Sequence, residues 1–305
     1  MLDKPDHAPL AAINDPVFLA NDLKLFLKRE DLLHPTVSGN KWRKLRYNLL
    51  QAKDENYDTV ISFGGAFSNH IHALAAGAKL YGLNAVGVIR GEKHIPLNST
   101  LAFAEENGMQ LHYISREAYR LKHTANFIDD LAVKYGRCYV IPEGGTNLLA
   151  VKGCAEIVED IPVPFDYICT SCGTGGTLAG LIAGCAGKGK LLGFSALKGG
   201  AFLHKEVEAL VKGYSGRKYT NWKIQDDYHF GGYAKIKPEL VVFIKAFAIK
   251  YGIQLDPIYT GKMMFGLFEL AKMGYFAPGT TIVALHTGGL QGLAGIKARK
   301  PDVGL

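Results

Sequence analysis

A regular alternation of two kinds of segment runs through the middle of the chain and limits what this sequence can fold into. Apolar runs of strand length recur four times, at residues 59–63, 85–89, 111–114 and 138–141. Between them, apolar residues at helical spacing predict helices over residues 68–80, 99–107 and 117–134. Strands that alternate with helices in this way favour a parallel sheet with helices on its faces.

The alternation resumes after a turn cluster at residues 142–147, which we interpret as a crossing between two domains. The second half predicts strands at 167–170, 191–197 and 281–285 and helices at 148–159, 176–186 and 202–212, while 213–236 is expected to be irregular. The predicted fold is α/β, with two open parallel-sheet lobes, helices on both faces and a ligand cleft between the lobes. We expect a larger domain of residues 1–45 and 150–305 and a smaller α/β domain of residues 46–149.

Composition argues against several other classes of protein. With 305 residues and 48% hydrophobic content, the chain can fill a sizeable core. The formal charge of +7 would suit an anionic ligand or nucleic acid, but the basic residues are dispersed, so no nucleic-acid partner is predicted. No run of residues has the length and apolarity of a membrane span, and residues 1–20 lack the apolar core of a signal peptide, so neither secretion nor membrane binding is expected.

The five cysteines are not expected to form a disulfide framework, because they are odd in number and the chain is long. A reducing cytoplasm is the expected location. Cys169 and Cys172 are spaced as a redox pair or as half of a zinc site. No second Cys-x-x-Cys and no His-x-x-His supplies the remaining ligands, so incidental spacing is the favoured interpretation and no metal is predicted.

Lys41 lies where a predicted strand over residues 23–28 gives way to a predicted helix over residues 42–52. Taken alone, a lysine with several basic neighbours is typical of a solvated helix face. We expect Lys44 and Arg46 to remain on such a face. The loops at the carboxyl ends of later strands favour a different role for Lys41, because ligands of open α/β sheets gather at those ends.

The first of these loops, Gly64–His70, joins a predicted strand to a predicted helix. Ser68, Asn69 and His70 supply polar side chains beside the free N–H groups of a helix start, which suits a carboxylate. The alternative is that Ser68 or Asn69 only caps the helix. This motif alone does not separate the two interpretations.

The second loop, Cys172–Thr177, is rich in glycine and threonine and again precedes a helix. Its backbone N–H groups can converge on a phosphate, with help from the threonine hydroxyls and the helix dipole. The loop lacks the Gly-Lys-Ser/Thr ending of a nucleoside triphosphate loop, and Leu178 stands where a dinucleotide motif has its third glycine. We therefore favour the phosphate of a smaller cofactor over a plain tight turn.

Two later segments, Asp256–Lys262 and Leu285–Gly289, also place polar side chains where an apolar run stops. Each is a weak signal by itself, since Tyr259 could be a core tyrosine and His286 a buried structural histidine. Their position along the chain, after the two earlier loops, is more informative about the class of protein than either segment alone.

Taken together, the Gly-Asn-Lys, Ser-Asn-His, Gly-Thr-Gly-Gly-Thr, Tyr-Thr-Gly-Lys and His-Thr-Gly-Gly motifs resemble one family of proteins. It is the 1-aminocyclopropane-1-carboxylate deaminase and D-cysteine desulfhydrase family, whose pyridoxal-phosphate enzymes have the tryptophan synthase β fold. The resemblance spans residues 28–289. It implies that pyridoxal 5′-phosphate lies in the cleft between the lobes.

The resemblance also implies roles for individual residues. Lys41 would be the covalent anchor of the cofactor aldehyde, and Thr260 would face the pyridine nitrogen. Catalytic roles would fall to four residues: Lys41, Ser68, Tyr233 and Tyr259. The cofactor phosphate and ring would be held by Asn69, Gly173, Thr174, Gly175, Gly176, Thr177 and Thr260. The substrate would be held by Ser68, Asn69, His70 and Thr287.

Three of these positions separate the subgroups of the family. The ring-opening deaminases resemble each other in having glutamate at the position of Thr260, leucine at that of Thr287 and glutamine at that of His70. A glutamate can keep the pyridine nitrogen protonated and so deepen the electron sink, whereas a hydroxyl needs no proton there. We therefore expect β-elimination from a small amino acid, with D-cysteine the best candidate.

Three alternatives stay open. They are a 1-aminocyclopropane-1-carboxylate deaminase, a non-catalytic homologue that binds an amino acid or the cofactor, and a plain phosphate-ester or nucleotide-binding module. The resemblance further implies a homodimer.

Overall fold

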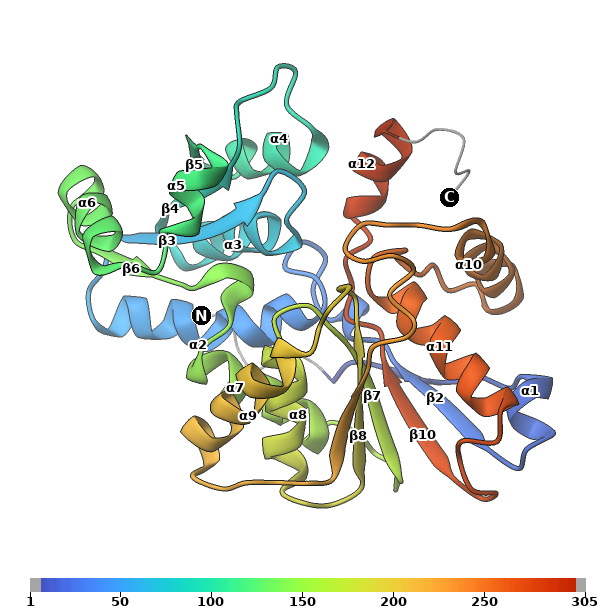
Figure 1. Cartoon of the computed structure of the whole chain (residues 1–305). Coiled ribbons are helices and arrows are strands. Elements are labelled where there is room, and N and C mark those ends of the chain that lie inside the picture. The colour runs from blue at the N-terminus through green and yellow to red at the C-terminus, as the bar shows by residue number, and fades with distance from the viewer. Residues whose placement is uncertain (1–6, 300–305) are drawn as a thin grey trace.

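The computed structural model describes residues 7–299 as two β-sheets with helices on both faces of each (Figure 1). The larger sheet has six strands in the order β1-β2-β10-β7-β8-β9. Their bounds are β1 Leu10–Ala12, β2 Lys24–Lys28, β7 Tyr167–Cys172, β8 Lys190–Ser195, β9 Trp222–Gln225 and β10 Thr281–Leu285. All neighbours pair in parallel except β1, which runs antiparallel to β2 at the edge. The prediction of parallel sheets is thus confirmed apart from this edge strand.

The smaller sheet has four parallel strands in the order β5-β4-β3-β6. The bounds of its strands are β3 Thr59–Gly65, β4 Asn84–Arg90, β5 Met109–Ile114 and β6 Cys138–Val140. Its central strands β3 and β4 are buried along most of their length and consist mainly of apolar residues, as expected where helices cover both faces of a sheet.

Helices α1, α10 and α11 pack on one face of the larger sheet, and α7, α8 and α9 pack on the other. Helices α2, α3 and α4 cover one face of the smaller sheet, and α5 and α6 the other. Their bounds are α1 Pro16–Leu19, α2 Asn40–Asp54, α3 Asn69–Tyr81, α4 Ser99–Glu106, α5 Arg116–Arg120, α6 Ala125–Tyr135, α7 Leu148–Glu159, α8 Gly176–Cys185, α9 Phe202–Ser215, α10 Pro238–Tyr251, α11 Thr260–Lys272 and α12 Gly292–Arg299. Two short 3-10 helices lie at Glu30–Leu32 and Glu143–Gly145.

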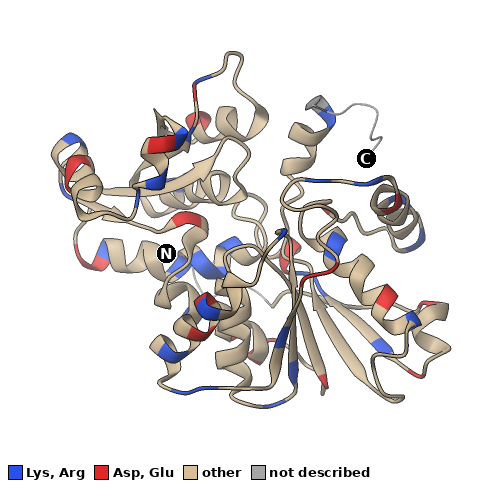
Figure 2. Cartoon of the chain, viewed as in Figure 1, with Lys and Arg blue, Asp and Glu red and all other residues tan. Residues whose placement is uncertain are grey.

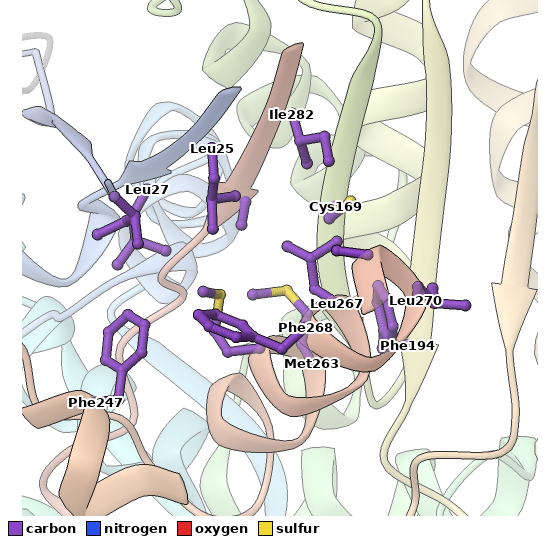
Figure 3. Packing of buried hydrophobic residues seen from close by; sticks show 14 of the residues in the cluster. Leu25, Leu27, Cys169, Phe194, Phe247, Met263, Leu267, Phe268, Leu270 and Ile282 are labelled. Carbon is purple, nitrogen blue, oxygen red and sulfur yellow. The ribbon is translucent and has the colours of Figure 1, made fainter. Parts of the chain in front are cut away.

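The core beneath α11 fixes where the start of that helix lies. Met263, Leu267 and Phe268 of α11 pack against side chains from four strands, including Leu25 and Ile282 (Figure 3). These side chains are almost completely buried. Burial of a large apolar side chain contributes about 1.5–3 kcal/mol, so α11 is held firmly against the sheet. The residues at its first turn are therefore well placed to serve as a rigid wall.

Cys169 and Cys172 are both buried and free. They lie on one strand three positions apart, so their side chains point to opposite faces of the sheet. Cys169 belongs to the core beneath α11, and Cys172 belongs to the core beneath α8. Burial raises the pKa of the Cys172 thiol to about 12. The two sulfurs do not form a redox pair in this structure.

Two predicted elements differ from the structure. The single helix expected over residues 117–134 is two helices, α5 and α6. Thr124 separates them, because its hydroxyl donates to the carbonyl of Leu121 and accepts from the N–H of Phe127, which starts a new helix. The prediction that 213–236 is irregular is wrong in part, since β9 lies within it and extends the sheet beside β8.

Within residues 7–299, no helix is both long and apolar enough to cross a membrane. Basic and acidic residues are interspersed over both lobes (Figure 2). The domain limits at residues 45 and 150 stay a prediction.

Candidate active site

Helix α2 begins against the loop that follows β10, and this contact positions Lys41. The N–H of Asn40 donates to the carbonyl oxygen of Thr287 at 3.3 Å. Gly39 precedes the helix with a φ of +67°, and a Cβ on Gly39 would lie 2.0 Å from that same oxygen. Only glycine allows this approach. The first turn of α2, with Lys41 in it, is therefore docked on the larger sheet.

The amine of Lys41 lies among polar groups from several elements. Its Nζ donates to Asn40 Oδ1 at 3.0 Å, and Asn40 Nδ2 donates to Thr177 Oγ1 at 2.8 Å. Burial lowers the pKa of Lys41 to about 8, although the Asp256 carboxylate opposes the shift. A larger fraction of the amine is therefore neutral near pH 8 than for an ordinary lysine. A neutral amine is what a nucleophile or a general base requires.

Lys44 lies one turn further along α2 and is 2% exposed. Its Nζ donates to Thr146 Oγ1 at 2.7 Å and to Thr174 Oγ1 at 3.4 Å. Burial lowers the pKa of Lys44 to about 7, and the charge of Lys41 adds to the shift. Lys44 therefore faces the interior between the two sheets.

The prediction that Lys44 and Arg46 remain solvated is wrong for both residues. The Arg46 side chain is only 15% exposed and pairs with Glu156 at 3.2 Å. The cause is the position of α2, which packs against α7 of the other lobe as well as against α3. Figure 2 shows the basic residues of α2 in the middle of the molecule.

The glycine-rich loop joins β7 to α8 and lies beside Lys44. Gly175 precedes the helix with a φ of +77°, and α8 starts at Gly176. A Cβ on Gly176 would lie 2.9 Å from Thr146 and 3.3 Å from Lys44 Cε. Free N–H groups at a helix start, two hydroxyls and a buried amine thus converge at one place. Among residues 7–299, Lys44 forms no ion pair, so its charge is available to an anion.

The Ser68–Asn69–His70 segment starts α3. Ser68 caps the helix by accepting from the N–H of Ile71 at 3.3 Å, so the capping interpretation applies to it. Asn69 reaches the loop after β10: a Cβ on Gly289 would lie 2.8 Å from Asn69 Nδ2. The two lobes therefore meet at Asn69, on the same loop that docks α2.

His70 points into the smaller lobe. Its Nε2 lies 2.7 Å from Ser62 Oγ, and the side chain is 2% exposed. Burial holds the pKa of His70 well below its usual range, and the charges of Lys41 and Lys44 add to this effect. His70 is thus a neutral imidazole close to both lysines. Its predicted contact with substrate stays a prediction.

Tyr259 and Tyr233 form an aromatic pair beside the glycine-rich loop. Their rings meet edge to face with centroids 6.2 Å apart. A Cβ on Gly173 would lie 3.4 Å from the Tyr259 hydroxyl, so this ring lies against the glycine-rich loop. Burial and the neighbouring Tyr233 hold the pKa of Tyr259 well above its usual range. The Tyr259 phenol is therefore protonated at neutral pH and can act as a proton donor.

Thr260 begins α11 and is completely buried. Its hydroxyl donates to Asp256 Oδ1 at 2.5 Å, and three backbone N–H groups from residues 258–260 also donate to that carboxylate. The hydroxyl hydrogen is thus committed to Asp256. The oxygen already accepts from the N–H of Asp256 at 3.2 Å and has one lone pair left for a further partner. Thr260 acts together with a carboxylate rather than as an isolated hydroxyl.

The structure therefore brings together residues from both lobes around the amine of Lys41. Thr287 joins the group through its carbonyl oxygen, which accepts from the N–H of Asn40, and its hydroxyl lies 3.3 Å from Ser171 Oγ. Sequence reasoning missed Lys44, Thr146 and Asp256. The spacing of Lys41 and Lys44 was a usable signal, because residues three apart share one face of a helix.

The lowered pKa of Lys44 predicts how stability depends on pH. The unfolded lysine binds a proton up to about pH 10.4, whereas the folded residue loses it near pH 7. Between these values the unfolded state binds more protons, so stability should rise with pH, with a contribution of up to about 1.4 kcal/mol per pH unit. Urea unfolding of the ligand-free protein at pH 7 and 8.5 should show a smaller rise for Lys44→Met than for the unaltered protein. An equal rise in both would mean that Lys44 is charged when folded.

Comparisons with known proteins identify the family of this chain. A family model described as pyridoxal-phosphate dependent enzyme matches residues 10–288. A Pyrococcus furiosus protein provisionally named 1-aminocyclopropane-1-carboxylate deaminase is 35% identical over 314 residues, covering 96% of this chain and 94% of that protein. The mitochondrial Arabidopsis thaliana protein named bifunctional D-cysteine desulfhydrase/1-aminocyclopropane-1-carboxylate deaminase is 33% identical over 298 residues, covering 90% of this chain and 74% of that protein.

A solved structure described as an ACC deaminase homologue has the same fold, with a TM-score of 0.87 and 29% identity. The match covers 98% of this chain and 94% of that one. The chain therefore belongs to the pyridoxal-phosphate-dependent enzymes. Within them it belongs to the 1-aminocyclopropane-1-carboxylate deaminase and D-cysteine desulfhydrase family, as the motifs indicated.

The residues present fit pyridoxal phosphate. Lys44, the hydroxyls of Thr146 and Thr174 and the start of α8 form a cradle for a phosphate, and the buried Lys44 amine has no carboxylate partner among residues 7–299. Lys41 offers a second amine from the same face of the helix, with a pKa near 8. The Asp256–Thr260 pair lies at the start of α11, and the Asp256 charge reaches Lys41.

Proposed function

We propose that this enzyme eliminates the β-substituent of a small amino acid, with D-cysteine the best candidate, and releases pyruvate, hydrogen sulfide and ammonia. The observation that carries the proposal is the position of Lys41 beside the phosphate cradle of Lys44 and the glycine-rich loop. Burial there lowers the pKa of Lys41 to about 8, so its amine is more easily neutral than that of an ordinary lysine. Bound pyridoxal phosphate would supply an electron sink for the charge left when the α-proton is removed. Lys41 would hold the cofactor and then act as the base that takes this proton.

The other residues have roles that follow from their contacts. Lys44 and residues 173–177 would bind the phosphate, and the free N–H groups at the start of α3, with Asn69, would bind the substrate carboxylate. Tyr259, whose raised pKa keeps it protonated at neutral pH, or its neighbour Tyr233 would donate a proton to the leaving sulfur. The overall reaction balances: D-cysteine and one water give pyruvate, hydrogen sulfide and ammonia.

A 1-aminocyclopropane-1-carboxylate deaminase is the second candidate, and the Asp256–Thr260 pair favours it. A threonine whose hydroxyl already donates to a carboxylate can accept a hydrogen bond from a protonated pyridine nitrogen. Asp256 would stabilise the positive charge through Thr260, much as a glutamate would do directly. Thr260 alone therefore no longer separates the two substrates, and the preference for D-cysteine depends on His70 and Thr287.

The test is to supply the purified enzyme with D-cysteine, L-cysteine and 1-aminocyclopropane-1-carboxylate side by side. Sulfide and pyruvate are measured for the first two, and 2-oxobutanoate for the third. We expect the highest kcat/KM with D-cysteine. A higher value with 1-aminocyclopropane-1-carboxylate would assign the second function, and no product from any of the three would overturn both.

A further inference from the structure

The segment that carries Tyr233 is held in an unfavourable backbone conformation. Phe230 and Ala234 have φ values of +54° and +56°, and the two glycines between them, Gly231 and Gly232, are also at positive φ. Side chains such as those of Phe and Ala are rarely found in this region, because the Cβ approaches the following carbonyl. Such strain persists only where the surrounding structure imposes it. Something must therefore hold this loop in place.

Lys262 supplies that restraint from helix α11. Its Nζ donates to the carbonyl oxygen of His229 at 2.9 Å and to that of Gly232 at 2.8 Å. The two carbonyls lie on either side of Phe230 and Gly231, and that of Gly232 directly precedes Tyr233. The Lys262 side chain therefore joins residues 229–232 to the start of α11, where Tyr259 and Thr260 also lie.

The position of Lys262 lowers the stability of the fold, which argues against a purely stabilising role for this residue. The side chain is 1% exposed, and within residues 7–299 it forms no ion pair. It is the third residue of α11, where the helix dipole disfavours a cation. Burial lowers the pKa of Lys262 to about 8. Burying an amine without a carboxylate partner costs free energy of folding, so its hydrogen bonds must be worth that cost. In Lys262 these hydrogen bonds go to the Tyr233 loop.

We propose that Lys262 is a positioning residue that fixes the Tyr233 hydroxyl over the substrate side of the site by clamping the carbonyls of His229 and Gly232. Tyr233 is 47% exposed, so packing alone does not hold it. Its ring meets the Tyr259 ring edge to face, and a shift of the loop would separate the two phenols. Lys262 thus links the wall of the site formed by α11 to the wall formed by the loop. This rests on the proposed role of Tyr233 in the reaction.

Lys28 provides a matched control. It is also fully buried, and its Nζ also donates to two backbone carbonyls, those of Ala8 at 2.6 Å and Asp160 at 2.8 Å. Lys28→Met therefore removes the same kind of contact from a place outside the Tyr233 loop. Any effect that Lys262→Met has beyond that of Lys28→Met reflects the particular loop that it clamps.

The first measurement is amide hydrogen exchange of the holoenzyme, which needs no turnover. We expect exchange in residues 229–235 to become at least tenfold faster in Lys262→Met and to stay unchanged in Lys28→Met. Unchanged exchange in Lys262→Met would overturn the clamp. If exchange becomes faster in Lys262→Met but the enzyme is inactive on every substrate tested, the role of Lys262 in holding the loop is supported. That result would contradict only the proposed function.

The second measurement is a double-mutant cycle with Tyr233→Phe. We expect Lys262→Met to lower kcat by about 10-fold or more in the unaltered enzyme and by less than about 3-fold when Tyr233→Phe is already present. Equal losses in both backgrounds would show that Lys262 does not act through Tyr233. If Lys262→Met does not fold, Lys262→Gln with Lys28→Gln as its control takes its place, since the amide still donates to one carbonyl.

Discussion

Lys41→Met should abolish turnover, with a fall in kcat of at least about 1,000-fold. The variant loses the amine that would hold the cofactor and take the α-proton, and a general base alone contributes about 100- to 10,000-fold. The change should leave the fold intact, because methionine is similar in length and, within residues 7–299, the Lys41 side chain forms one hydrogen bond, to its own neighbour Asn40. Product formation from the best substrate, with added pyridoxal phosphate, is the measurement.

Lys53→Met is the matched control for this prediction, because Lys53 lies on the same helix and its side chain is exposed. It should retain activity within about twofold. A Lys41→Met enzyme with more than a tenth of the normal kcat would contradict the assignment of Lys41.

Lys44→Met should weaken binding of the cofactor phosphate by about 10- to 100-fold. A hydrogen bond between charged partners contributes about 1.5–3 kcal/mol, and Lys44 is the amine that lies among the hydroxyls of Thr146 and Thr174. Pyridoxine 5′-phosphate is the suitable probe, because it has the phosphate but no aldehyde to react with an amine. Its Kd is measured by titration calorimetry at pH 7.

The pH dependence of this binding gives a further check on Lys44. Because its pKa is about 7 without a ligand, the amine must take up a proton to bind an anion above that pH. The affinity should therefore fall as the pH rises from 7 to 9, and Lys44→Met should flatten this change. An unaltered Kd in Lys44→Met would show that the phosphate lies elsewhere.

The sequence alone was sufficient for the alternation of strands and helices and for the loops at their ends. Residues 59–141 show this most clearly, since the apolar runs of β3 and β4 and the N-cap of α3 can all be recognised from residue type and spacing. Strand β9 was harder to recognise. It has only four residues, lies at the sheet edge and has one buried residue, so its pattern is weak.

The environment of the basic residues on α2 could not be predicted in this way. Periodicity indicates which residues share a helix face, but it does not indicate whether that face meets water or another lobe. Lys44 and Arg43 are buried because α7, more than a hundred residues later in the sequence, packs against the same helix. Arg43 is neutralised there by Glu30 at 2.9 Å and by Asp160. Such long-range partners are properties of the fold rather than of the local sequence.

The partner of Thr260 shows the same limit at the site itself. By residue type, Thr260 supplies a hydroxyl where a deaminase would supply a carboxylate. In the structure, a tight turn brings the carboxylate of Asp256 to that hydroxyl at 2.5 Å. The difference between the subgroups is therefore smaller than a comparison of single positions implies.

The central claim is that Lys41 holds the cofactor covalently, and that Lys44, which lies one turn away on the same face of α2, does not. The most direct test is to reduce the holoenzyme with borohydride, digest it and locate the pyridoxyl group by mass spectrometry. We predict one pyridoxyl group per chain, on Lys41, because Lys44 is engaged with the hydroxyls of the phosphate cradle. A pyridoxyl group on Lys44, or on neither lysine, would contradict the account.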